Sequence, residues 1–284
     1  MILDYTVKYS ATNRYEALVK NAVWQFLIKP EENEYQEIKS FDFSSSIKGS
    51  IDYSVNALGF ETIRLSVLEN LREIEFNAEF EVNKKTFNPF DFESLGRTKE
   101  LEIINSLDFK TEFEPYLKRT ELTKIDLSEE KLFRLDAVEP TFNQLQKLNT
   151  WVYNHIEFKP GVTSVKTSAS KVLKMEEGVC QDFSHLFCAI CRENSIPARY
   201  VSGYLHQGIG YSGDSQLHAW AECYVPGIGW VGFDPTNNLI VSQDHIKICH
   251  GKDYNDCSPL KGIIYATGSG SNTSEHRVQV SAQQ

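Results

Sequence analysis

One cysteine in this 284-residue sequence occupies a position in which it could act as a nucleophile. Cys180 follows a glycine break at Gly178 and precedes apolar residues at helical spacing, namely Phe183, Phe187 and Cys191. This spacing predicts a buried helix with Cys180 in its first turn. There the free backbone N–H groups and the positive end of the helix dipole favour a thiolate over a thiol. Such a cysteine can attack a carbonyl carbon, provided that a base lies beside it.

The base and a carboxylate to orient it are expected on a β-hairpin further along the chain. His218 opens a strand-like run that ends at Val225, and a second short run ends at Asp234, just before Pro235. A Pro/Gly turn at 226–229 joins the two runs and predicts a hairpin. A helix N-terminus that faces such a hairpin would bring together a thiolate, an imidazole base and a carboxylate that fixes the imidazole tautomer.

Each of these three residues also has an ordinary structural explanation. A buried cysteine is usually a small core residue, and a histidine on a strand is usually a polar residue with satisfied hydrogen bonds. An Asp-Pro step at the end of a strand is usually a turn. The joint arrangement, rather than any one residue, favours catalysis.

Three motifs at these positions resemble those of the bacterial transglutaminase-like proteins, a branch of the papain-like cysteine enzymes. They are Gly178-Val-Cys180-Gln-Asp-Phe, His218-Ala-Trp-Ala-Glu and Gly229-Trp-Val-Gly-Phe-Asp234-Pro-Thr-Asn. Matching motifs on either side extend the resemblance from roughly Phe142 to Gly262. The resemblance implies that Cys180, His218 and Asp234 form the catalytic triad, and the chain keeps the family's residue at all three positions.

The expected fold class is α+β, with a papain-like or transglutaminase-like catalytic domain that follows a small β-sandwich-like domain. Residues 1–85 are expected to form the β-rich N-terminal domain and residues 86–284 the catalytic domain, with a polar, proline-bearing boundary at 83–91. Short strand-like runs without a helix between them predict the sandwich. These runs are Tyr5–Tyr9, Trp24–Ile28, Ile51–Val55, Thr62–Val67 and Ile74–Val82.

Helical spacing replaces strand alternation after this boundary. The predicted helices are Glu100–Leu107, a helix capped by Ser128 that continues to Leu135, Thr141–His155 and Ser168–Met175. The other predicted elements are a core strand at Ile196–Tyr204, a loop at 208–214 that either borders substrate or simply joins two strands, and a final strand at His276–Ala282.

Composition argues against several classes of protein. An apolar content of 41% and a charged content of 24% are typical of a soluble globular chain. A net charge of −10 argues against nucleic acid and anionic membrane surfaces as partners. The first residues contain no apolar stretch of signal-peptide length, and no segment has the length of a membrane span. These patterns predict a cytoplasmic protein with neither nucleic acid nor membrane as a partner, and the resemblance implies a protein or peptide substrate.

The six cysteines are expected to be reduced thiols rather than a disulfide framework. Cys188 and Cys191 have the spacing of a metal or redox pair, but they lie within the predicted helix, so core packing is favoured. His245, Cys249 and His250 are also potential metal ligands, although alternation there favours an ordinary strand. No acidic loop of the EF-hand type occurs. We therefore expect neither a metal nor another cofactor.

The chemistry that these residues predict is acyl transfer through a thioester. The Cys180 thiolate would attack an amide carbonyl, His218 would protonate the departing amine, and water or a second amine would resolve the thioester. The backbone N–H of Cys180 is the expected first oxyanion donor, and Gln181 and Trp220 are candidates for the second. Peptidase, amidase and glutamine cross-linking activities all remain open, and the alternative is a non-catalytic binding module that keeps the fold.

Overall fold

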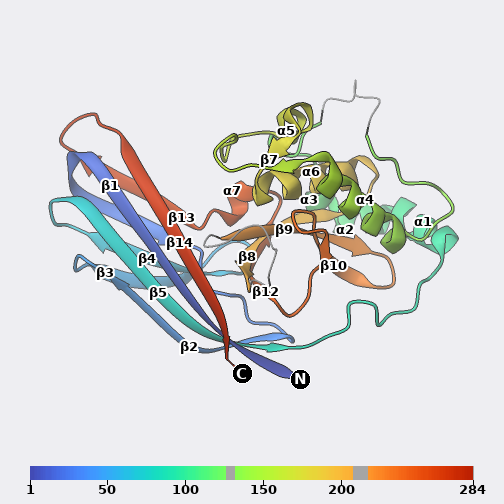
Figure 1. Cartoon of the computed structure of the whole chain (residues 1–284), viewed down its shortest axis with the longest axis horizontal. Helices are drawn as coiled ribbons and strands as arrows, with labels where there is room; N and C mark the ends of the chain where they lie inside the picture. The colour runs from blue at the N-terminus through green and yellow to red at the C-terminus, as the bar shows by residue number, and fades with distance from the viewer. Residues whose placement is uncertain (126–131, 207–216, 284) are drawn as a thin grey trace.

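The computed structural model describes residues 1–125, 132–206 and 217–283 of the chain. Two β-sheets lie next to each other, and most of the helices gather around the second sheet (Figure 1). The first sheet has seven strands and the second has five, and a two-stranded ribbon completes the strand pairing. No helix in these ranges is long and apolar enough to cross a membrane.

The first sheet is organised around β1, a strand of 25 residues that spans Ile2–Phe26. Its strand order is β2-β5-β1-β4-β3, and two strands from the C-terminal end of the chain also pair with β1. All of these pairings are antiparallel. The other strands are β2 (Gln36–Ser45), β3 (Ser50–Val55), β4 (Glu61–Val67), β5 (Leu71–Lys85), β13 (Leu260–Ala266) and β14 (Asn272–Gln283).

The prediction of two separate strands within residues 5–28 is wrong, because β1 is continuous. Its register with β5 shifts between Arg14 and Val19, so the strand is irregular there without leaving the sheet. On one side its partner changes from β5 to β4, and on the other side from β14 to β13. The polar residues that suggest a turn remain extended because they pair with strands on both sides of β1.

The two halves of this sheet face each other across one core. Trp24, in the second half of β1, packs edge-on against Phe76 of β5, with 5.2 Å between ring centroids. Phe26 contacts Phe43 of β2 at 5.1 Å. All four side chains are buried. Since β5 and β2 belong to the half of the sheet bonded to the start of β1, the sheet folds over on itself, and the predicted sandwich-like region is confirmed.

The chain returns to this first sheet at its C-terminal end. β14 pairs with residues 4–15 of β1, and β13 pairs with residues 19–26. The predicted final strand, His276–Ala282, is confirmed as part of β14. The division into residues 1–85 and 86–284 stays a prediction, but the hydrogen bonds of β13 and β14 place both strands in the sheet that contains the N-terminal part.

The second sheet has the order β11-β10-β9-β8-β12 and is antiparallel throughout. The predicted hairpin is confirmed as β9 and β10, with Gly229 paired to Val225 next to the turn. The predicted core strand is confirmed as β8, although it begins two residues later than expected because Pro197 cannot donate to a ladder. The strands are β8 (Ala198–Leu205), β9 (His218–Val225), β10 (Gly229–Asp234), β11 (Leu239–Ile240) and β12 (His245–Gly251).

The helices follow the predicted periodicity closely where their apolar faces are clear. The strongest prediction, Thr141–His155, coincides with α4, whose apolar face lies in the second core. A two-residue strand after α4, β6 (Glu157–Phe158), pairs in parallel with another just before Cys180, β7 (Glu177–Gly178). The other helices are α1 (Arg97–Asn105), α2 (Leu107–Glu112), α3 (Glu114–Leu117), α5 (Ala169–Met175), α6 (Cys180–Glu193) and α7 (Tyr254–Cys257).

Two predictions involve residues without a described structure. Ser128, the expected cap of a helix, lies outside the described residues, and residues 132–135, which would continue that helix, are not helical. There the backbone N–H of Leu135 donates to the side chain of Asn194 at 3.1 Å, so a tertiary contact replaces a helical hydrogen bond. The loop predicted at 208–214 also lies outside the described residues.

The helix α6 is the central helix of the second core. Every residue from Gln181 to Arg192 is buried, because α6 packs against β8 and β9 as well as α4 and α5. Cys188 and Cys191 are both completely buried, as expected for core packing. A helix enclosed in this way holds its first turn in a fixed position, and that turn contains Cys180.

Candidate active site

Cys180 is the first residue of α6, as predicted from the sequence. Its side chain is half-buried, and its Sγ lies 4.0 Å from the carbonyl oxygen of Leu217. Leu217 directly precedes β9, which begins with His218. The candidate nucleophile therefore lies against the start of the strand that carries the candidate base.

A buried carboxyl group fixes the backbone on which Cys180 is mounted. Oδ2 of Asp182 accepts hydrogen bonds from the backbone N–H of Val179 at 2.8 Å and from the hydroxyl of Thr163 at 2.6 Å. Burial raises the pKa of Asp182, although these two hydrogen bonds oppose the shift. Gly178 is required for packing, because an added Cβ would lie 2.7 Å from the Cβ of Asp182. The glycine break in the sequence thus makes room for this carboxyl group.

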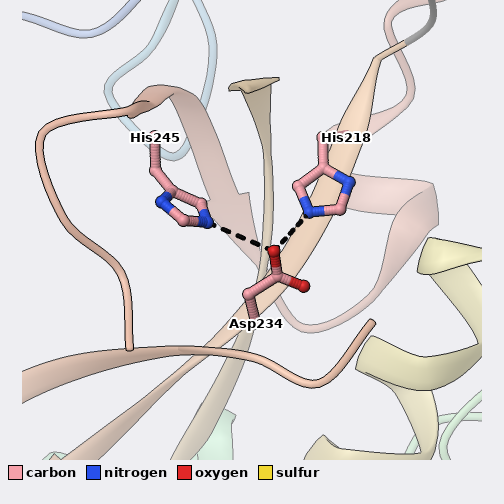
Figure 2. A group of neighbouring side chains, drawn as sticks. All are labelled: His218, Asp234 and His245. Atoms are coloured by element: carbon pink, nitrogen blue, oxygen red, sulfur yellow. Dashed lines mark hydrogen bonds and ion pairs between the residues drawn. The ribbon is translucent and has the colours of Figure 1, made fainter. Parts of the chain in front are cut away.

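His218 and Asp234 are joined by a hydrogen bond across the β9–β10 hairpin. Nε2 of His218 donates to Oδ2 of Asp234 at 2.8 Å, and both side chains are fully buried (Figure 2). Because the hairpin pairs Phe233 with Ala221, Asp234 at the end of β10 lies diagonally across from His218. The hairpin register therefore accounts for the contact between the two residues.

The carboxylate of Asp234 accepts hydrogen bonds on both oxygens. The backbone N–H groups of Thr236 and Asn237 donate to Oδ1 at 3.1 and 3.3 Å. Oδ2 also accepts from the side-chain amide of Asn237 at 2.9 Å and from Nε2 of His245 at 3.2 Å. Burial alone would raise the pKa of Asp234, but His218 and His245 hold it well below its usual range. This carboxylate is ionised and fixed in orientation.

The imidazole of His218 is held in its charged form. Burial opposes protonation, yet the charge and hydrogen bond of Asp234 and the proximity of Cys180 outweigh burial and raise the pKa of His218 to about 10. The second ring nitrogen, Nδ1, is buried and has no partner of full hydrogen-bond geometry among the described residues. Cys180 and His218 therefore interact electrostatically, but no hydrogen bond of full geometry joins their side chains. This is common in sites without substrate.

The structure brings a further residue, His245, to this group. The strand predicted around His245 is confirmed as β12. The side chain of His245, the first residue of β12, reaches Asp234 (Figure 2). The two neighbours that suggest metal ligands in the sequence lie elsewhere: Cys249 is in the core, and His250 contacts Arg199. No local pattern places His245 near Asp234, because β12 pairs with β8 and not with the hairpin.

His218, Asp234 and His245 also offer a donor set for a metal, since their ligand atoms lie within 4.8 Å of one another. The hydrogen bonds argue against that use. The backbone N–H of Ser242 donates to Nδ1 of His245 at 3.4 Å, which places the proton of this imidazole on Nε2. A metal would need Nε2 to be unprotonated. The three residues therefore fit a hydrogen-bonded group better than a metal site.

Two residues are candidates for the second oxyanion donor. Trp220 is buried, and its Nε1 makes no hydrogen bond among the described residues. Its ring fits only because Gly203 on β8 has no side chain, since an added Cβ would lie 2.3 Å from that ring. Gln181 lies in the first turn of α6, where backbone N–H groups lack intrahelical acceptors. Each of these two residues therefore offers an N–H group. Which of them is the second oxyanion donor stays a prediction.

The first sheet also reaches this site. Cys180 and Leu217 pack against a buried cluster that the first sheet shares with β8, β9 and β12. The hydroxyl of Tyr5 on β1 donates to Asp244, the residue before His245, at 3.0 Å. The N-terminal part of the chain therefore contacts the segment that carries His245.

Part of this chain is similar to known proteins. Residues 133–235 match the model of the transglutaminase-like superfamily. An uncharacterized protein of Mycobacterium tuberculosis is 38% identical over 141 residues, which cover 46% of this chain and 45% of that protein. The protein-glutamine gamma-glutamyltransferase of Pseudomonas aeruginosa is 30% identical over 94 residues, which cover 30% of this chain and 14% of that protein. The chain spans about half the length of its mycobacterial relative.

A solved structure shares the fold of the whole chain. The crystal structure of a protein from Cytophaga hutchinsonii, described as a candidate cysteine protease, superposes with a TM-score of 0.79 at 23% identity. The superposition covers 100% of this chain and 92% of that chain, so both sheets belong to the shared fold. Residues 133–235, which match the transglutaminase-like superfamily, include Cys180, His218 and Asp234.

The raised pKa of His218 predicts how the reactivity of Cys180 depends on pH. A positive charge on His218 that persists up to about pH 10 attracts an anionic nucleophile beside it. A free thiol loses its proton only near pH ~8.5. We expect iodoacetamide to label Cys180 at about pH 6 with at least a tenth of its rate at about pH 9. In His218→Ala, labelling at the lower pH should fall by at least about tenfold.

Peptide mapping distinguishes Cys180 from the other five cysteines, all of which are buried. They serve as internal controls for unfolding, because they become reactive only when the core opens. A steep rise of Cys180 labelling with pH, as for an ordinary thiol, would contradict the ion pair.

Proposed function

We propose that this protein is an enzyme that transfers acyl groups from amide bonds through a thioester on Cys180. The observation that carries the proposal is the buried His218–Asp234 pair beside a half-buried cysteine at the N-terminus of a buried helix. A protein that only binds its partner has no need for an ionised, five-fold hydrogen-bonded carboxylate behind a charged imidazole.

The first half of the reaction forms the thioester. The Cys180 thiolate attacks the amide carbonyl carbon, and the carbonyl oxygen takes the negative charge. When the C–N bond breaks, Nδ1 of His218 gives its proton to the departing amine. Asp234 retains the proton on Nε2 of His218, which keeps Nδ1 as the atom directed to the sulfur and the substrate.

The second half of the reaction restores the thiolate. Water or an amine attacks the thioester carbonyl carbon and loses a proton to Nδ1 of His218, and the C–S bond breaks. Water gives hydrolysis and an amine gives transamidation. The backbone N–H of Cys180, at the positive end of α6, is the first donor to the oxyanion in both halves.

Hydrolysis of a peptide or amide bond is the first candidate activity. Transamidation of protein glutamine is the second, because the Pseudomonas aeruginosa relative of part of this domain is a protein-glutamine gamma-glutamyltransferase. Four further predictions rest on composition and resemblance: a protein or peptide substrate, no nucleic acid or membrane partner, no cofactor, and a cytoplasmic location. The non-catalytic binding module remains the alternative.

A single assay separates these activities. The enzyme is incubated with unstructured proteins and glutamine-containing peptides, with and without a fluorescent primary amine, and ammonia, new peptide ends and bound label are measured. We expect ammonia or new ends without label, and we expect Cys180→Ala to lose either product. Because each bound amine also releases one ammonia, label that nearly equals the ammonia released would make transamidation the main activity. Absence of all three products from the wild-type protein would favour the binding module.

A further inference from the structure

The carboxylate of Asp234 lies between two imidazole rings that come from different strands (Figure 2). Nε2 of His218 on β9 and Nε2 of His245 on β12 both point to Oδ2 of Asp234, at 2.8 and 3.2 Å. All three side chains are almost completely buried, with exposed fractions of 0–1%. The cysteine and the thioester chemistry account for His218 and Asp234, but they leave the second imidazole without a role.

Hydrogen bonding and burial define the state of His245. Its Nδ1 accepts from the backbone N–H of Ser242, so Nε2 carries the proton and donates it to Asp234. Burial lowers the pKa of His245, and the charges of His218 and Lys84 oppose protonation too, although Asp234 favours it. The net effect is a neutral imidazole. His245 is therefore a hydrogen-bond donor without charge, next to an imidazole that carries a charge.

This difference matters for the base. A second positive charge beside Asp234 would repel the proton on His218 and weaken the ion pair with the thiolate. A neutral donor instead restrains rotation of the carboxylate and leaves its charge available to His218. Trp220 packs edge-on against His245 at 5.2 Å between ring centroids and helps to hold the ring in place.

We propose that His245 is a positioning residue: a neutral N–H donor that holds Oδ2 of Asp234 in the orientation in which it binds the imidazole of His218. The role rests on the proposed function, because it serves the reaction of Cys180. Its physical basis does not depend on turnover, since the orientation of Asp234 and the tautomer of His245 exist in the resting protein.

Three variants test the donor. His245→Gln keeps an N–H group that can reach Asp234, whereas His245→Leu fills a similar volume without a donor. His250→Gln, on the same strand, removes an imidazole that contacts Arg199 and not Asp234. The readouts are the iodoacetamide labelling rate of Cys180 at about pH 6 and kcat with the best substrate found. A further readout is the set of histidine ring-nitrogen shifts of the ¹⁵N-labelled wild-type protein between about pH 6 and 8.

The expected loss is specific to the donor. His245→Leu should reduce both rates by about tenfold, the effect of one hydrogen bond to a charged group. His245→Gln should recover most of this loss, and His250→Gln should match the wild type. The nitrogen shifts should show one neutral histidine protonated on Nε2 over the whole pH range, which His245→Gln removes from the spectrum.

Several results would overturn the role. Equal losses in His245→Gln and His245→Leu would mean that the ring acts only by packing. Wild-type labelling in His245→Leu would mean that Asp234 needs no further donor. A charged His245, or bound metal in the purified protein, would refute the neutral-donor state even if the variants failed to fold. Wild-type turnover by Cys180→Ala would instead refute the proposed function and leave the nitrogen shifts to decide the state of His245.

Discussion

We expect Cys180→Ala to lower amide turnover by at least about 10⁴-fold and to preserve the fold. The loss is large because the reaction has no other nucleophile: the remaining cysteines are buried in the two cores. The fold survives because Cys180 is half-buried and its Sγ makes only a long, weak contact, at 4.0 Å, to the carbonyl oxygen of Leu217. Turnover at saturating substrate and the thermal unfolding midpoint are the measurements.

Cys188→Ala is the matched control for this result, because Cys188 lies on the same helix but inside the core. It should cost about 1 kcal/mol of unfolding free energy through the small cavity that it leaves, and it should retain turnover. The two variants thus separate chemistry from packing. Turnover by Cys180→Ala within about tenfold of the wild type would refute the thioester mechanism.

Asp234→Asn should have the second-largest effect, a loss of about 10³–10⁴-fold in kcat. The amide cannot hold an imidazolium, so the raised pKa of His218 should fall towards its ordinary value and the low-pH labelling of Cys180 should disappear. The variant should also be less stable by about 1–3 kcal/mol, because donors that face the carboxylate would then face an amide N–H₂ group. Asp244→Asn, which alters a neighbouring carboxylate that binds Tyr5, is the control.

The pH dependence of stability gives an independent check on Asp234. Its pKa in the folded protein is depressed below the ordinary value of 3.8, so its ionised form stabilises the fold above that pH. This contribution declines as the pH falls below that value. Denaturant unfolding of the wild type should therefore show a loss of stability in acid that Asp234→Asn lacks. The same acid dependence in both proteins would show that Asp234 is not the group responsible.

The parts of the site that sequence could predict are those defined by neighbours along the chain. The helix that starts at Cys180 and the hairpin that carries His218 and Asp234 both have local signals, namely helical spacing after a glycine and a Pro/Gly turn between two strand-like runs. Asp182 and His245 have no such signal. Asp182 accepts a hydrogen bond from the backbone N–H of Val179, next to Gly178. His245 reaches Asp234 from β12, a strand that pairs with β8.

Among the helices and strands, too, sequence predicts those with local signals and misses those that depend on distant partners. α4 follows from the spacing of its own apolar residues, and its predicted bounds were correct. The continuity of β1 does not, because the polar residues in its middle are kept extended by partners that lie far away in sequence. The helix expected beyond Ser128 fails over residues 132–135 for a similar reason, since Asn194 takes a backbone N–H that a helix would use.

The return of β13 and β14 to β1 has a consequence for how the protein is made. During synthesis β1 emerges before its partners, and β4 and β5 follow soon after, but the strands that cover its other edge come much later in the chain. Until then a ribosome-bound chain exposes an unpaired edge of up to 25 residues, which is the kind of surface that recruits other nascent chains. Pairs such as Asp4 with Gln283 also join residues that are far apart in sequence, so we expect slow folding that is limited by closure of this sheet. The transglutaminase-like domain, which lies between β5 and β13 in the sequence, can form its helices and hairpin while that edge is still open.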